Sequence, residues 1–228
     1  IIPQLGSNPA YFCTYNNAVY FSAFRPVDGR ELWKTDGTAA GTVLVKDFAS
    51  GGGFPSNLIE YNGLLYFTAN TPNQGYTLYK SNGTTNGTVA VKLPSNGGPN
   101  GFPDALPVIF KGKLFFAADD ANGSGIWYSD GTAAGTSKLP DSPAEFNSAP
   151  GNLLATSNYL YYTASNDLNG NSNTGVYRTT EISNQNILLT TASFNANDFQ
   201  SLYLVNGCLL VRGDDNGATG EEIYWRYF

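Results

Sequence analysis

The chain alternates short apolar runs with turns rich in glycine, asparagine and aspartate along its whole length. Runs such as AVYFSA, LLYFTA and KLFFAA have the length of β-strands, and no segment shows the helical period of about 3.6 residues. Pairs of runs are separated by the two-residue turns Asn16-Asn17, Asn62-Gly63, Lys111-Gly112, Ser157-Asn158 and Asn206-Gly207. Asn-Gly between apolar runs indicates a tight hairpin, because both central residues take positive φ. The pattern predicts an all-β chain.

These elements recur in five units. Three segments superimpose directly, namely ELWKTDGTAAGT, TLYKSNGTTNGT and GIWYSDGTAAGT, and two looser copies follow, GVYRTTE and EEIYWRY. The aromatic residues that anchor the copies are spaced by 46, 48, 50 and 47 positions: Trp33, Tyr79, Trp127, Tyr177 and Tyr224. Each unit is interpreted as four short antiparallel strands. Four such strands in about 45 residues predict a β-propeller blade.

The repeat predicts a single five-bladed β-propeller over residues 1–228. The expected blades cover about 9–54, 55–102, 103–149, 150–198, and 199–228 together with 1–6. The last unit reaches Phe228 without room for a fourth strand, and the apolar run Ile1-Ile2-Pro3-Gln4-Leu5 precedes the first unit. We expect this N-terminal strand to pair with the last blade and close the ring. Pro3 is tolerated there, because an edge strand has unpaired positions.

Composition and charge exclude several classes of function. The chain has no His and two Cys, which excludes Ser-His-Asp machinery, His-based metal sites and cysteine-rich metal clusters. A net charge of −6 argues against a nucleic-acid phosphate backbone as partner. No apolar run reaches the roughly 18 residues of a membrane-spanning helix. The chain starts at Ile1 and lacks Met, so we interpret it as a processed product or an excised fragment. We expect export to the extracellular space, the cell surface or the periplasm.

The segment ELWKTDGTAAGTVLVKDF resembles the repeat of secreted bacterial proteins whose units read ELWxSDGTxxGTxLVKDI. The stretch LLYFTANTPNQGY is similar to their LFFxAxDxxxGxELW segment. The likeness is close in units one to three, looser in units four and five, and spans nearly the whole chain. Unit four departs most, since Thr179-Thr180-Glu181 replace the DGT turn. The resemblance implies an exported propeller and no single activity.

The DGT turns and the aromatic anchors are most simply structural. Asp36 and Asp130 are suited to accept N–H bonds within their turns, and Gly37, Gly83 and Gly131 permit positive φ. Thr38, Thr84 and Thr132 suit hydrogen bonding in the same turns. We expect the anchors to pack between blades, with a ligand cage as the alternative.

Two further features could bind a metal or form a disulfide. Asp120, Asn122 and Ser124 match the first half of a calcium loop, D-x-N-x-S-G, but Gly131 falls where such a loop has its Glu, so an ordinary turn is the alternative. No catalytic cofactor is expected. Cys13 and Cys208 would lie in neighbouring blades of a closed ring. A bridge would stabilise it by about 4 kcal/mol, and two buried free thiols are the alternative.

Three classes of function remain. A propeller glycosidase needs carboxylates converging on the central channel, but the first strands supply only Glu60 and, just before its strand, Asp104. We therefore expect no enzyme. A lectin-like propeller would repeat one sugar pocket in each blade, whereas here the loops differ in chemistry between blades. A non-catalytic protein–protein interaction or adhesion module, alone or as an accessory subunit of a surface or secretion complex, fits best.

The expected contact surface is the face formed by the loops between second and third strands and by the links between blades. These loops vary in length and chemistry, and recognition commonly resides in variable loops on a rigid scaffold. The predicted contact residues are aromatic, basic, acidic or amide side chains: Phe24, Arg25, Tyr76, Asp120, Asn169 and Asp215.

Overall fold

The computed structural model describes ten stretches of the chain. They are residues 6–48, 51–71, 75–92, 106–120, 123–139, 150–166, 173–180, 187–191, 199–214 and 221–227. These stretches contain nineteen β-strands and no helix, which confirms the all-β prediction. Consequently no described segment is a helix long and apolar enough to span a membrane. The predicted N-terminal closing strand falls on residues 1–5, outside the described residues.

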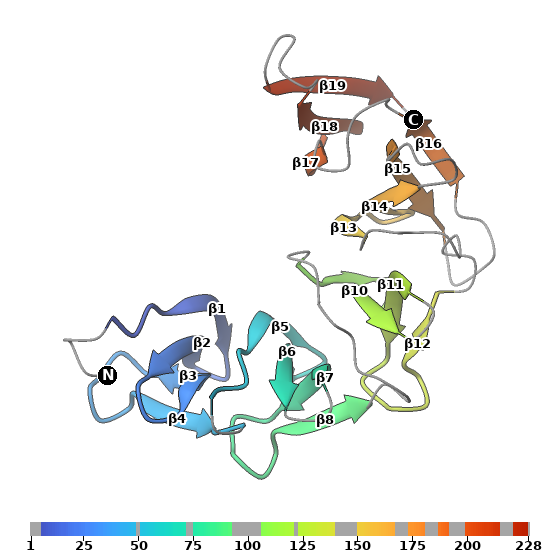
Figure 1. Ribbon diagram of the computed structural model, residues 1–228. Helices are drawn as coiled ribbons and strands as arrows, with labels where there is room; N and C mark the ends of the chain where they lie inside the picture. The colour runs from blue at the N-terminus through green and yellow to red at the C-terminus, as the bar shows by residue number, and fades with distance from the viewer. Residues whose placement is uncertain are drawn as a thin grey trace. The chain divides into compact units, whose positions relative to one another are not determined.

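The chain divides into two compact units, Ile1–Gly101 with Gly131–Thr136, and Phe102–Asp130 with Ser137–Phe228. The first unit contains two antiparallel sheets (Figure 1), each with its four strands side by side in chain order. The first sheet is formed by β1 (Ala10–Tyr15), β2 (Ala18–Arg25), β3 (Gly29–Thr35) and β4 (Val43–Lys46). The second is formed by β5 (Ser56–Tyr61), β6 (Leu64–Thr71), β7 (Gly75–Ser81) and β8 (Val89–Lys92).

The second unit contains three antiparallel sheets with the same order of strands. The third sheet of the chain is formed by β9 (Val108–Phe110), β10 (Lys113–Asp120), β11 (Gly123–Ser129) and β12 (Ser137–Lys138). The fourth is formed by β13 (Gly151–Ala155), β14 (Leu160–Asn166), β15 (Asn173–Thr179) and β16 (Ile187–Thr191). The fifth has three described strands, β17 (Phe199–Val205), β18 (Cys208–Asp214) and β19 (Glu221–Tyr227).

The hairpins between first and second strands follow the sequence prediction in four sheets. Their central residues have positive φ, as in Asn62 (50°) with Gly63 (74°) and Asn206 (51°) with Gly207 (80°). The fourth sheet differs, because Ser157 and Asn158 do not have positive φ. Thr156 nevertheless donates its backbone N–H to the Tyr159 carbonyl over 2.9 Å, so that only Ser157 and Asn158 lie between the bonded residues. The position of the predicted two-residue turn is therefore confirmed, and only the expected positive φ is wrong there.

The hairpins between second and third strands are tighter than the sequence predicts. The expected loops span residues 23–30, 70–76, 119–125, 165–175 and 213–221. Instead β2 continues to Arg25, which pairs with Gly29, and β10 continues to Asp120, which pairs with Gly123. Backbone groups of paired strands satisfy one another, so the ladder runs on through polar residues that the hydropathy pattern assigns to loops. The predicted loop boundaries are wrong in these hairpins.

The DGT turns close on themselves as predicted. Asp36 Oδ1 accepts the backbone N–H of Thr38 over 2.9 Å and its hydroxyl over 2.7 Å, and Asn82 does the same for Thr84. Gly37, Gly83 and Gly131 have φ of 94°, 86° and 90°. The turn is thus a local structure that each repeat forms from its own residues.

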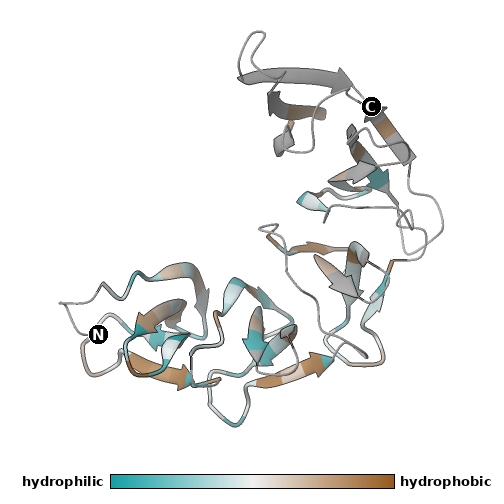
Figure 2. Cartoon of the chain, in the orientation of Figure 1, coloured by the Kyte–Doolittle hydropathy of each residue, from teal (hydrophilic) through white to brown (hydrophobic). Residues whose placement is uncertain are grey.

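Consecutive sheets within a unit pack face against face. In the first unit Tyr20, Leu32 and Val45 of the first sheet meet Leu65, Phe67 and Tyr79 of the second. In the second unit Phe115, Ile126 and Leu139 meet Leu160, Tyr162 and Tyr177. Figure 2 shows the hydrophobic character of the fourth strands β4 and β8. The anchors Tyr79 and Tyr177 lie between sheets as predicted, while Trp33 packs against Phe21 and Ala23 of its own sheet.

Polar contacts also cross between sheets of the first unit. Lys34 Nζ donates to the Gly83 carbonyl over 3.0 Å, and Tyr20, the cross-strand partner of Lys34, places its hydroxyl where a Cβ on Gly83 would stand. Lys80 and its cross-strand partner Tyr66 meet Gly131 in the same way, with a Lys80 hydrogen bond of 2.9 Å. We call such a Lys–Tyr pair with its glycine the latch. It occurs twice among the described residues.

Candidate functional site

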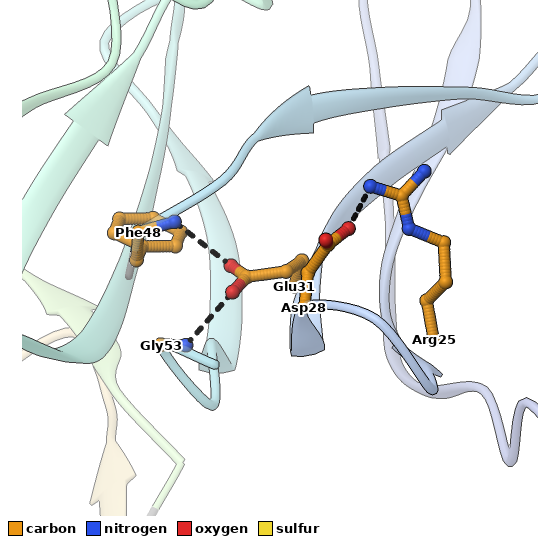
Figure 3. A network of polar contacts seen from close by, with 5 residues as sticks. All are labelled: Arg25, Asp28, Glu31, Phe48 and Gly53. Carbon is orange, nitrogen blue, oxygen red and sulfur yellow. Dashed lines mark hydrogen bonds and ion pairs between the residues drawn. The ribbon is translucent and has the colours of Figure 1, made fainter. Parts of the chain in front are cut away.

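The β2–β3 hairpin of the first sheet holds two of the predicted contact residues, Phe24 and Arg25. Arg25 ends β2, and its guanidinium forms an ion pair with Asp28 across the turn (Figure 3). The turn is closed by the Asp28 N–H, which donates to the Arg25 carbonyl over 3.2 Å. Gly29 has a φ of 88°, and a Cβ there would collide with the backbone of Gly51. The hairpin is therefore fitted closely to the link that leads to the second sheet.

The described residues of that link, 47–48 and 51–54, are fastened along the hairpin, and we call them the strap. Gly52 forms a parallel bridge with Arg30, and the Phe54 N–H donates to the Arg30 carbonyl over 3.0 Å. The Asn70 N–H, at the end of β6, donates to the Gly53 carbonyl over 2.6 Å. The hairpin and the strap thus lie side by side. The predicted contact surface, formed by loops between second and third strands and by links between blades, requires this arrangement in the first sheet.

Glu31 on β3 is the fastening point of the strap. Its side chain is fully buried, and its two oxygens accept the backbone N–H groups of Phe48 (3.1 Å) and Gly53 (3.3 Å) (Figure 3). The pKa of Glu31 is raised to about 7, chiefly by burial and also by Asp47, although the two N–H donors and Arg25 oppose the shift. A perturbed carboxyl often marks an active site. Here both oxygens are used by the scaffold, so the geometry favours a structural role.

Apolar side chains project from this scaffold into solvent. Val27 at the tip of the hairpin is 83% exposed, Phe24 is 41% exposed, and Phe54 on the strap is 45% exposed. Phe24 pairs across the hairpin with Arg30, whose carbonyl accepts the Phe54 N–H, so these residues are neighbours. We call Phe24, Arg25, Val27 and Phe54 the hairpin surface. It combines exposed apolar area with one guanidinium on a tightly bonded backbone.

The sequence interpretation missed Val27, Phe54 and Glu31. The signal for Glu31 was present, since it lies two positions before the aromatic anchor Trp33 and so shares the same face of the strand. Buried carboxylates need hydrogen-bond donors, so this position indicates a polar partner. The identity of that partner depends on the path of the strap, which lies 17 to 22 residues further along the chain.

Of the other predicted contact residues, one lies close to the strap. Tyr76 lies on β7, half-buried and paired with Asn70, whose N–H donates to the Gly53 carbonyl of the strap. Asp120 ends β10, in the second unit. Asn169 and Asp215 lie outside the described residues. The contact prediction therefore stays a prediction for Asp120, Asn169 and Asp215.

The calcium and disulfide predictions remain predictions. Asp120 pairs with Gly123 in a hairpin and Ser124 lies on β11, whereas Asn122 is outside the described residues. Within the described ranges no group of three His, Cys, Asp or Glu side chains could hold a metal ion. Cys13 and Cys208 are free thiols that belong to different units, and burial raises the pKa of the Cys13 thiol.

The carboxylates considered for glycosidase chemistry do not form a described pair. Glu60 is exposed on β5, and its Oε1 accepts the Gly63 N–H over 2.8 Å in the following hairpin. Asp104 lies outside the described residues. Glu60 therefore acts as a cap of its own hairpin.

No family model matches the chain, and no curated protein matches its sequence. Among solved structures it is similar to the computationally designed Ika8 protein, with a TM-score of 0.54 and 12% identity over 96% of this chain and 58% of that one. It is also similar to a puromycin hydrolase, with a TM-score of 0.58 and 18% identity over 95% of this chain and 39% of that one. A puromycin-hydrolyzing peptidase of Mycobacterium tuberculosis gives a TM-score of 0.56 and 10% identity, over 93% and 36%. The chain thus spans under two thirds of each, and the likeness concerns the fold alone.

Proposed function

We propose that the chain is a non-catalytic, exported, five-bladed β-propeller that binds a protein partner through its loop face. The resemblance to the secreted ELWxSDGTxxGT-repeat proteins supports export and the propeller arrangement. So does the way consecutive sheets meet within each unit. The first strands of neighbouring sheets lie against one another, β1 with β5 in the first unit, and β9 with β13 and β13 with β17 in the second. First strands gathered in this way are typical of blades arranged about a common axis.

Closure of the ring is part of the same proposal. The fifth sheet has three described strands, with β19 at its edge. The apolar residues Ile1–Leu5 supply a strand for that edge. Closure abolishes an unpaired strand edge, which is otherwise prone to unwanted pairing.

The hairpin surface is the observation that carries the proposed binding role. Val27 and Phe24 expose apolar side chains next to the guanidinium of Arg25, on a backbone that Glu31 and Arg30 fasten to the strap. Aromatic and Arg side chains contribute most of the binding free energy in many protein interfaces. A rigid surface also loses little conformational entropy when a partner binds. These properties favour recognition over catalysis.

Partner retention from the native extracellular or envelope fraction tests this proposal. The wild-type chain is immobilised next to the triple variant Phe24→Ser, Arg25→Ala, Val27→Ser and next to Thr38→Ala, Thr132→Ala, which alters only DGT turns. We expect the hairpin variant to lose the bound protein and the turn variant to keep it. Circular dichroism confirms that both variants fold.

The opposite pattern would refute the proposal, with the partner lost from a folded turn variant and retained by the hairpin variant. Retention of a glycan by every variant, without a protein, would instead indicate a lectin. Turnover of that glycan would indicate an enzyme.

A further inference from the structure

Two N–H donors on the first sheet are buried without an acceptor among the described residues. They are the indole Nε1 of Trp33 and the Nε of Arg25. Trp33 is only 7% exposed. The Arg25 guanidinium lies over the Trp33 ring, with its central carbon 5.7 Å from the ring centre. A buried donor without an acceptor costs about 1–3 kcal/mol, so such a pair requires an explanation.

The third sheet shows how the same position is normally satisfied. Trp127 stands where Trp33 stands in the repeat, and its indole N–H donates to the Ala118 carbonyl over 3.1 Å. Ala23 is the counterpart of Ala118, yet the Trp33 indole makes no such bond. The fold therefore offers a backbone acceptor for this tryptophan, and the first sheet leaves it unused.

The unpaired donors lie next to the hairpin surface. Arg25 is the last paired residue of β2, and its side chain is 38% exposed. One of its terminal nitrogens already pairs with the Asp28 carboxylate, which leaves Nε–H as the donor directed toward the interior. Exposed Val27 lies two residues further along the hairpin, whereas Phe24 projects from the other face of β2. Arg25 is the more exposed of the two side chains, and its guanidinium lies over the Trp33 ring.

We propose that Arg25 and Trp33 form a binding site for the side-chain carboxylate of an Asp or Glu residue in a partner protein. This inference rests on the proposed function and names the chemistry that the hairpin surface recognises. The two carboxylate oxygens accept the two unpaired N–H groups, and the charge of the ligand matches that of the guanidinium. Charge-assisted bonds between Arg and carboxylate are about twice as strong as neutral ones. The exposed apolar side chain of Val27 favours a residue within a protein surface over a small free acid.

Indole N–H resonances provide a direct test, because the chain has three Trp residues. The ¹⁵N-labelled protein is titrated with the blocked peptide acetyl-Gly-Glu-Gly-amide, and Trp33→Phe and Trp127→Phe assign the signals. We expect the Trp33 indole signal to move downfield and saturate, while the Trp127 signal stays in place. The peptide with Gln in place of Glu should bind about tenfold more weakly. Acetyl-Gly-Gly has a free C-terminal carboxylate and no side-chain carboxylate. It tests whether the site binds a chain terminus instead of an Asp or Glu side chain.

Arg25→Lys is the matched variant, because Lys keeps the charge and lacks Nε–H. It should abolish the Trp33 shift, with the unchanged Trp127 signal as a check on folding. The proposal is overturned if the Trp33 signal stays in place at every concentration, or if the Gln peptide moves it equally. It is also overturned if the free chain end binds better than the Glu side chain. If the peptide binds while the hairpin variant, which lacks Arg25, retains the native partner, a carboxylate site exists that this partner does not use. That result would refute the proposed function and the assignment of the site to that partner.

Discussion

The contact between the first and second sheets differs in kind from the contact between the third and fourth. Both have an apolar layer, but the first also has the latch, together with Thr85 Oγ1 donating to the Val45 carbonyl over 2.8 Å. In the third sheet Phe115 stands at the position of Tyr20 and Tyr128 at that of Lys34. Tyr128 instead carries the Lys113 ammonium over its ring, at 4.8 Å.

The glycine of the latch is absent from the repeat that follows the one without the Lys–Tyr pair. The fourth repeat has Glu181 at the position held by Gly83 in the second and Gly131 in the third. Donor pair and glycine are more than forty residues apart, so neither is locally required by the other. The difference shows that the latch belongs to a pair of consecutive repeats and not to a single one.

Gly83→Ala should cause the largest loss of stability among the variants that test the latch. Alanine at positive φ costs about 1–2 kcal/mol, and its Cβ would also collide with the Tyr20 hydroxyl. We expect a loss of about 3 kcal/mol in the free energy of unfolding, measured in denaturant. Gly37→Ala is the control, since its φ of 94° is similar and a Cβ there meets nothing within 4 Å. It should cost about 1 kcal/mol. Equal losses would mean that the latch adds no steric constraint.

Phe115→Tyr tests whether a donor alone can rebuild the latch. Phe115 is 2% exposed, so the new hydroxyl would be buried opposite a repeat without the glycine. We expect a loss of about 2 kcal/mol, since a buried hydroxyl without a partner costs about 1–3 kcal/mol. Thermal unfolding measures the change. A stabilised variant would show that the hydroxyl finds an acceptor without the glycine.

Lys34→Met removes the ammonium and keeps an apolar side chain of similar length. The Gly83 carbonyl would lose its charged donor, at a cost of about 1.5 kcal/mol. Lys46→Met on β4 is the control, because Lys46 is also half-buried and donates no hydrogen bond in the described part of the structure. Denaturant midpoints of the two variants give the comparison. Identical midpoints would exclude a net contribution from the Lys34 bond.

Glu31→Gln should lower stability and also change its pH dependence, because an amide offers one acceptor oxygen to the two N–H donors. The pKa of Glu31 is raised from about 4.5 to about 7 in the folded protein, so its contribution is complete below pH 4.5 and is lost as the pH rises to about 7. The wild type should therefore lose about 2 kcal/mol more than Glu31→Gln between pH 5 and 7.5. Denaturant unfolding at each pH measures this slope. Parallel slopes would show that Glu31 titrates normally.

Local chemistry explains which predictions from the sequence were correct. The hairpin at Asn62-Gly63 and the turn at Asp36-Gly37 are formed by adjacent residues, and their positive φ follows from residue type. Predictions failed where a neighbouring strand decided the outcome. Arg25 was placed in a loop, but pairing with Gly29 extends β2 through it. Ser157-Asn158 connects its strands where the sequence predicts, but without the positive φ expected of such a turn.

By itself the sequence determined the repeat, the all-β class, the strand order within a sheet and the turns that close on their own residues. These features depend on interactions between residues a few positions apart in the sequence, and the same interactions recur in each repeat. Only the tertiary structure decided that Lys34 reaches Gly83, that Glu31 holds Phe48 and Gly53, and that Trp33 lacks the acceptor that Trp127 has. The physical reason is that each of these outcomes depends on how distant segments, or equivalent side chains in different repeats, are packed. The repeat pattern makes Trp33 and Trp127 equivalent, whereas their surroundings give the Trp127 indole N–H an acceptor and leave the Trp33 indole N–H unpaired.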